Sequence, residues 1–180
     1  MPEVSLRKCC VKGWLPVIVW AALIFLFSSD LFSGANTAGV IAPWLRRTFP
    51  AWSADQIDGV HLLIRKLGHV SEYFIFALLL MRALRLQAAK ALDAKQFFLG
   101  IAVTALYAIS DELHQIFVPS RSASDIDVLI DVCGGLAGSL CFYFWSWRKQ
   151  LESAADSNVP RAEKNLDNPR VNREDNINRL

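Results

Sequence analysis

Four apolar stretches constrain the fold of this chain more than any other feature of its sequence. They lie at residues 14–32, 67–86, 97–117 and 128–147. A helix of about 20 apolar residues crosses a hydrocarbon core of roughly 30 Å, and backbone in lipid must satisfy its own hydrogen bonds. Stretches such as YFIFALLLM also lack the polar stripe of a helix that packs on a soluble core. The sequence therefore predicts an all-α fold, a bundle of four transmembrane helices.

The first stretch has a second interpretation. Arg7, Lys8 and Lys12 precede the apolar run, and small residues follow it at 33–35, as in a cleaved secretory signal peptide. The run continues through Phe32, however, and three more predicted spans follow. These two features favour a retained first span.

The distribution of lysine and arginine predicts the orientation, because these residues accumulate on the cytoplasmic side. They gather before the first span, between the second and third, and after the fourth: Arg7, Lys8, Lys12, Arg82, Arg85, Lys90, Lys95, Arg148 and Lys149. The third connection has only Arg121, although the first connection carries four basic residues and blurs the signal. Both termini are therefore expected in the cytoplasm. Residues 1–13 form a short N-terminal segment, and residues 148–180, polar and without aromatics, are predicted to be a disordered tail.

The segment SADQIDGVHLLIRK at 53–66 predicts a further helix between spans one and two. Ser53 followed by Gln56 has the capping-box pattern. Apolar residues then recur at helical spacing up to Ile64. We expect a short amphipathic helix at the outer interface that runs into span two.

Ionisable side chains gather at one end of the four predicted spans. With both termini inside, this end faces outward, and it includes the segment SDELHQIFVPSRSASDIDVLID at 110–131. At 1.5 Å per helical residue, Glu72, Asp111 and Asp131 all lie roughly 9 to 10 Å below the outer end of the bundle. The sequence therefore predicts one layer of polar residues that is contributed by three helices.

This layer has two explanations. A charge that faces lipid near mid-bilayer costs about 2.5 to 3.5 kcal/mol, so these side chains should face each other or water. In the first explanation, Arg121 and Lys66 neutralise the acids, and the network only fixes the bundle. Against this, five acids meet two permanent cations and two histidines. Such a pocket should keep a proton on a carboxyl, or hold a cation or a ligand.

Metal and cofactor sites find little support in the sequence. Asp111, Glu112 and His114 are adjacent but lack HExxH spacing, and the four cysteines show no metal spacing. The glycines at 134, 135 and 138 follow no strand, so they indicate close helix contact rather than a phosphate loop. We expect no metal and no cofactor. The net charge of +2 gives no indication of nucleic-acid binding.

Two segments resemble the VanZ-like family of small bacterial membrane proteins, which is named after an accessory protein of teicoplanin-resistance gene clusters. They are KLGHVSEYFIFALLL at 66–80 and SDELHQIFVPSRSASDIDVLIDVCGGLAG at 110–138, and FSSD at 27–30 is similar more loosely. The resemblance covers residues 14–147, with Ser120 in place of the glycine that usually follows the loop proline. It implies the four-span fold, a retained first helix and the bacterial cytoplasmic (inner) membrane. It brings no defined reaction.

The resemblance and the polar layer together predict a pocket that binds or transports an anionic amphiphile, such as an envelope lipid or a lipid-linked cell-wall precursor. A link to glycopeptide resistance is implied by the family alone. The expected ligand-binding residues are Lys66, His69, Glu72, Asp111, Glu112, Gln115, Arg121, Asp127 and Asp131.

Two other functions stay open. One is a membrane-embedded hydrolase or transferase, in which Glu112 or Glu72 pairs with His69 as acid and base. The other is a bundle that partners another envelope protein. No Ser, Cys or Thr stands beside a convincing base, since Ser110 is on the wrong face from Asp111. This favours binding over catalysis.

Overall fold

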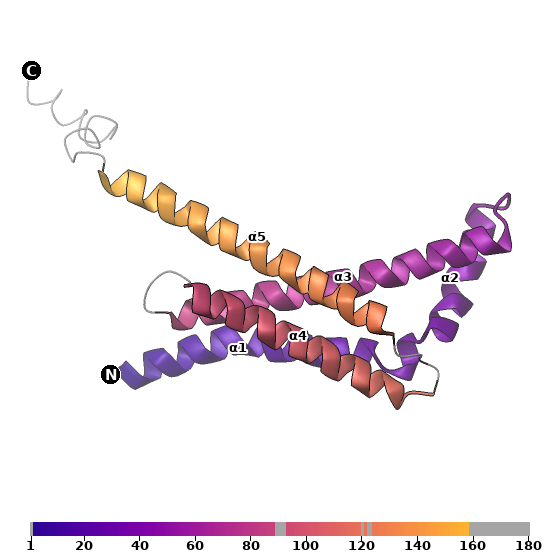
Figure 1. Ribbon diagram of the computed structural model, residues 1–180, viewed down its shortest axis with the longest axis horizontal. Helices are drawn as coiled ribbons and strands as arrows, with labels where there is room; N and C mark the ends of the chain where they lie inside the picture. The colour runs from indigo at the N-terminus through magenta and orange to yellow at the C-terminus, as the bar shows by residue number, and fades with distance from the viewer. Residues whose placement is uncertain (1, 89–92, 120, 122–123, 159–180) are drawn as a thin grey trace, which may run out of the picture. The chain divides into compact units, whose positions relative to one another are not determined.

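The computed structural model describes residues 2–88, 93–119, 121 and 124–158, and every regular element among them is a helix (Figure 1). In chain order these are α1 (Pro2–Phe27), the 3-10 turn η1 (Asp30–Phe32), α2 (Gly34–Thr48), α3 (Ala54–Gln87), α4 (Ala94–Ile116) and α5 (Asp125–Asn158). The predicted all-α class is confirmed.

Three of the helices are long and apolar enough to cross a membrane: α3, α4 and the part of α5 from Asp125 to Ala154. A fourth candidate span exists only if two helical segments, Val11–Phe27 and Asp30–Thr48, are counted together, and these segments are bent by 66° relative to each other. The described chain therefore has three to four candidate spans. The first one differs from the predicted 14–32, because its helix ends at Phe27 and the Ser29 hydroxyl bonds back to the Leu26 carbonyl at 2.6 Å.

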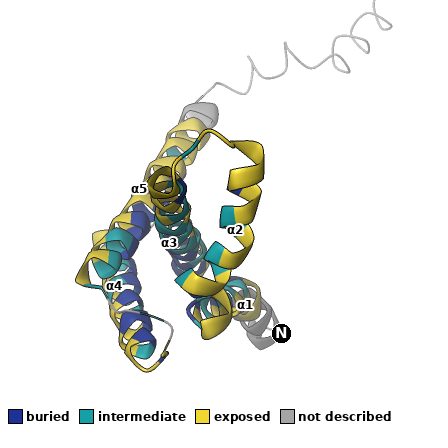
Figure 2. Ribbon diagram, turned by 90° about the vertical axis from the view of Figure 1, so that its right-hand side faces the viewer, coloured by how far each residue is buried: buried dark blue, intermediate teal, exposed yellow. Residues whose placement is uncertain are grey.

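The connection between the first two predicted spans contains a helix that the sequence did not indicate. α2 begins after Ser33, whose hydroxyl accepts a hydrogen bond from the Asn36 amide at 3.3 Å. Most of α2 is exposed, and Leu45 is its buried residue (Figure 2). The helix expected to start at Ser53 has its complete capping box and forms the first part of α3, which continues into the predicted second span.

The core lies along α3, which packs between α1 and α4 (Figure 2). Tyr73, Phe76, Leu80 and Met81 of α3 belong to this core and are almost completely buried. Two polar contacts fasten α1 to its neighbours: the Trp20 indole donates to the Glu72 carbonyl of α3 at 2.9 Å, and the Tyr107 hydroxyl of α4 donates to the Ala21 carbonyl at 2.7 Å.

Glycines let α5 approach α3 and α4 closely. A Cβ atom at Gly134 would lie 2.6 Å from the Val70 carbonyl oxygen, and one at Gly138 would lie 2.4 Å from that of Phe74. A Cβ at Gly135 would meet the Thr104 methyl of α4 at 2.4 Å. Because only glycine fits at such a contact, the predicted role of these residues in helix packing is confirmed.

The chain forms two compact units, residues 1–144 and residues 145–180, and the site described below belongs to the first. α5 continues through the second unit as far as Asn158. The predicted start of a disordered tail at residue 148 is therefore corrected, since residues 148–158 are helical, and residues 159–180 lie outside the described chain. Similarly, α1 begins at Pro2, so residues 2–13 continue the first helix.

Candidate functional site

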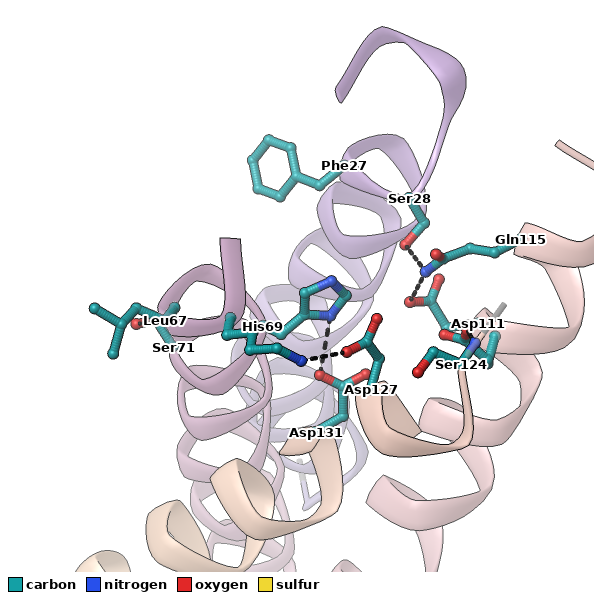
Figure 3. Close-up of polar contacts among 12 residues, drawn as sticks. Phe27, Ser28, Leu67, His69, Ser71, Asp111, Gln115, Ser124, Asp127 and Asp131 are labelled. Atoms are coloured by element: carbon teal, nitrogen blue, oxygen red, sulfur yellow. Dashed lines mark hydrogen bonds and ion pairs between the residues drawn. The ribbon is translucent and has the colours of Figure 1, made fainter. Parts of the chain in front are cut away.

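The residues predicted to bind a ligand come together at one end of the bundle, and we call them the polar cluster. They are Lys66, His69 and Glu72 of α3, Asp111, Glu112 and Gln115 of α4, Arg121 of the following connection, and Asp127 and Asp131 of α5. Figure 3 shows the side chains of His69, Asp111, Asp127 and Asp131 directed into the space between the helices. The charges of Glu72, Asp111 and Asp131 are close enough to interact, as expected for one layer.

Two ion pairs connect α3 with α5. Lys66 Nζ lies 3.2 Å from Asp127 Oδ1, and both side chains keep some exposure, 34% and 22%. His69 Nδ1 lies 3.1 Å from Asp131 Oδ1, and these side chains are 12% and 0% exposed. The outer pair is partly solvated, whereas the deeper pair is buried. Loss of one partner should therefore destabilise the protein much more in the buried pair than in the partly exposed pair.

Asp111 and Gln115 face α1. The Gln115 amide donates to Asp111 Oδ2 at 3.3 Å and to the Ser28 hydroxyl at 3.5 Å. All three residues are buried. Ser28 comes from the end of α1, so the looser FSSD resemblance marked a residue that contacts the polar cluster.

Glu112 points away from this group. Its Oε1 atom accepts a hydrogen bond from the main-chain amide of Ser124, directly before α5. A helix leaves its first amides without internal partners, and a carboxylate at that end is electrostatically favourable. Glu112 thus fastens the last turns of α4 to the first turn of α5.

Arg121 has a role that the sequence did not suggest. From the sequence, Arg121 was expected either to neutralise the acids of the layer or to bind a ligand. In the structure its Nη2 atom donates to the main-chain carbonyls of Phe27, Ser29 and Phe32, at 3.3 Å for Ser29 and 2.9 Å for Phe32. These carbonyls lie at the end of α1 and in η1, where helix geometry leaves acceptors free.

The surroundings of Arg121 include a second guanidinium. Burial lowers the pKa of Arg121, and the charge of Arg65 lowers it further, while nearby acids such as Asp111 oppose both effects. Arg65 lies against the start of α2, since a Cβ at Gly34 would be 2.0 Å from Arg65 Nη1. Two arginines from distant parts of the chain are therefore neighbours.

Several buried polar atoms, four of the cluster and one of Tyr73, have no hydrogen-bond partner within the described chain. These atoms are Asp111 Oδ1, Glu112 Oε2, Asp131 Oδ2, Arg121 Nε and the Tyr73 hydroxyl. More than nine in ten buried polar groups in proteins are paired, and an unpaired one costs free energy. The ion pairs and hydrogen bonds of the cluster thus leave much of its polarity unused, which argues against a purely structural network.

A cavity of about 270 Å³, which we call the arginine cavity, opens between α1, α2 and α3. Its polar lining includes Arg65, His69, Glu72 and Arg121. Its apolar lining consists of Phe27, Phe32, Ile41 and Ile64. Neither Arg65 as a site residue nor the helix α2 was predicted from the sequence. Arg65 was visible only as one of the basic residues that blurred the orientation signal.

A second cavity of about 300 Å³, the acidic cavity, lies between α4 and α5. It is lined by the carboxylates of Glu112 and Asp125 and by the apolar residues Ile109, Leu113, Ile116 and Val128. The single pocket expected from the sequence is therefore two cavities of opposite charge. Lys66, Asp111, Gln115, Asp127 and Asp131 line neither of them. Among the described residues, no group of three or more His, Cys, Asp or Glu could hold a metal ion.

Comparison with known proteins gives one match. The family model described as VanZ/LLP1 matches residues 13–146, which is most of the chain. No curated protein and no solved structure matches. The matched range includes every residue of the polar cluster and of both cavities.

Proposed function

The chain belongs to the VanZ/LLP1 family, and on that premise we propose that this multi-pass membrane protein binds the anionic headgroup of an amphiphile in the arginine cavity. The ligand class is an envelope lipid or a lipid-linked cell-wall precursor. Such binding is also the first step of any transport of the same molecule.

The observation that carries this proposal is the pair Arg65 and Arg121 in one cavity with apolar walls. Guanidinium groups pair in two-point fashion with phosphate and carboxylate groups. Arg121 uses Nη2 for main-chain carbonyls, and its Nε atom is without a partner within the described chain. Ile64 beside the cavity is 41% exposed, so an acyl or prenyl chain can leave along an apolar surface.

The membrane arrangement that fits this function has four spans, both termini in the cytoplasm and the polar cluster at the outer face of the bacterial inner membrane. In this arrangement α1 makes the first crossing, with Arg7, Lys8 and Lys12 at its cytoplasmic end, and its 26 residues extend over about 39 Å at 1.5 Å per residue. η1 and α2 then lie at the outer interface. Val40 and Trp44 of α2 are 74% and 62% exposed, as expected for residues that contact lipid headgroups.

A membrane-embedded hydrolase or transferase is the second candidate, and the pair His69–Asp131 favours it. His69 lines the arginine cavity, and the buried Asp131 holds its Nδ1 atom at 3.1 Å. A carboxylate that orients a histidine is the usual support of a general base. If the protein is such an enzyme, a lipid-linked precursor incubated with it will change in mass, and the His69→Asn variant will leave it intact.

The binding proposal is tested with the full-length protein in detergent by native mass spectrometry. The probe is a polyprenyl phosphate, and a diacylglycerol without charge serves as the lipid control. Arg65→Gln should weaken phosphate binding roughly ten- to hundredfold, because a hydrogen bond to a charged group contributes about 1.5 to 3 kcal/mol.

Arg47→Gln is the matched control variant, since Arg47 is an exposed arginine in the last turn of α2 and does not line the cavity. It should bind the phosphate as the wild type does. If Arg65→Gln binds as tightly as Arg47→Gln, the arginine cavity is not the headgroup site. A resistance role is tested separately, by measuring teicoplanin susceptibility of cells with and without the wild-type protein.

A further inference from the structure

We propose that the acidic cavity between α4 and α5 is a second binding site, which takes the primary ammonium group of an amphiphile such as an ethanolamine phospholipid. This site does not depend on the arginine cavity, which lies between other helices and has the opposite charge.

Glu112 is the main determinant of the site. Only 6% of this residue is exposed, yet its carboxylate contributes to the cavity lining. One oxygen, Oε1, accepts from the Ser124 amide, whereas the buried Oε2 has no hydrogen-bond partner within the described chain. A buried carboxylate oxygen without a donor is costly, and an ammonium group supplies both the donor and the compensating charge.

Asp125 adds a second carboxylate to the same cavity. Its place in the first turn of α5 is favourable for an acid in any case, so its position alone indicates little. Together with the buried Glu112, however, it gives the cavity two acids, and none of the described residues that line it is basic.

The two permanent cations of the polar cluster, Lys66 and Arg121, are engaged elsewhere. Lys66 pairs with Asp127 at 3.2 Å, and Arg121 donates to carbonyls of α1 and η1. Neither lines the acidic cavity. The negative charge of this cavity is therefore available to a ligand.

The walls decide which kind of cation fits. Leu113 and Ile116 are 54% and 58% exposed, and they lie on the surface of a helix that is long and apolar enough to cross a membrane. Hard metal ions such as Ca²⁺ take six to eight oxygen ligands, whereas this cavity offers two carboxylates among apolar side chains. An ammonium group that carries an apolar chain matches both features.

The test uses the full chain in detergent, with phosphatidylethanolamine and phosphatidylglycerol as competing probes in native mass spectrometry. The comparison is made in the Arg65→Gln background, which weakens the binding of lipid phosphates in the arginine cavity. This protein should prefer phosphatidylethanolamine, and the added Glu112→Gln should lose about tenfold or more of its affinity for this lipid, the effect of one charged hydrogen bond. Glutamine retains an acceptor for the Ser124 amide, so the connection to α5 is preserved. Asp58→Asn, an exposed acid of α3 outside both cavities, is the matched control in the same background and should leave this affinity unchanged.

A second variant protects the test against misfolding. Ile116→Trp fills the cavity from an exposed position and should block phosphatidylethanolamine while Glu112 remains intact. Free ethanolamine added as a competitor tells whether the amine alone suffices or the lipid chain is needed. If neither Glu112→Gln nor Ile116→Trp changes phosphatidylethanolamine binding, the proposal is overturned. Because the variants are compared in the Arg65→Gln background, their effect on binding is separated from the phosphate site.

Discussion

Gly138→Ala tests the close contact between α5 and α3. The added Cβ would lie 2.4 Å from the Phe74 carbonyl oxygen, which is closer than the 3.0 Å that Cβ atoms normally keep from any heavy atom, and 3.1 Å from the carbonyl carbon. The obstacle is main chain, so relief requires a shift of the helices by roughly half an ångström. Overpacking of this kind costs about 1 to 3 kcal/mol. Alanine regains at most about 1 kcal/mol through its higher helix propensity, which leaves a net loss.

Thermal unfolding in detergent, followed by circular dichroism, measures this loss. Gly59→Ala in α3 is the matched control, because nothing lies within 4 Å of the Cβ that it adds. The control should be as stable as wild type or up to about 1 kcal/mol more stable. Gly134→Ala, with its Cβ 2.6 Å from the Val70 carbonyl oxygen, should behave like Gly138→Ala. If Gly138→Ala melts at or above the temperature of Gly59→Ala, the helices do not approach as described.

Three further predictions concern the polar end of the bundle. Arg121→Lys should lower the free energy of unfolding of the ligand-free protein by about 1 to 3 kcal/mol in denaturant titration, because the shorter lysine side chain does not place its ammonium group where Nη2 donates to the carbonyls. Unchanged stability would contradict this role. Asp131→Ala should lower the free energy of unfolding by about 3 to 5 kcal/mol, since it leaves His69 buried without its partner. Asp127→Ala should lower it by about 1 kcal/mol or less, because the pair of Asp127 with Lys66 is partly exposed. Equal losses in the two variants would refute the comparison. The topology is tested in a background without native cysteines, with an impermeant thiol reagent and intact or outer-membrane-permeabilised cells. Ala35→Cys on α2 should react and Lys95→Cys on α4 should not. The reverse pattern would place the polar cluster on the cytoplasmic side.

The sequence predicted the features that depend on regular geometry. Helical periodicity is fixed, so Asp111 and Gln115 could be assigned to one face of a helix, and Glu72, Asp111 and Asp131 to one depth. The start of α3 followed from the capping box of Ser53 with Gln56. These inferences need only the order of the residues within a single segment.

The missed features depend on contacts between distant segments. α2 is an exception, because its apolar residues Val40, Ile41, Trp44 and Leu45 do recur at helical spacing. Its glycines and Pro43 are residues that usually mark loops, and they obscured this pattern. The neighbours Arg65 and Arg121 belong to different connections, and no local pattern joins them. The target of Arg121 was not predictable either, because main-chain carbonyls have no sequence signature.

The distribution of partners decides between a structural network and a binding site. If the cluster existed only to neutralise its own charges, Arg121 would pair with an acid; instead it donates to carbonyls of α1 and η1. Glu112 and Asp111 accept from an amide of the main chain and of glutamine, respectively, and each keeps a buried oxygen without a partner within the described chain. Neutral donors offset the charge of a carboxylate less than a paired cation does, and a buried charge that is only partly offset is expensive at this depth. The end of the bundle that holds these acids is thus less stable than apolar packing would make it. A ligand that binds in one of the two cavities beside it can offset this loss of free energy.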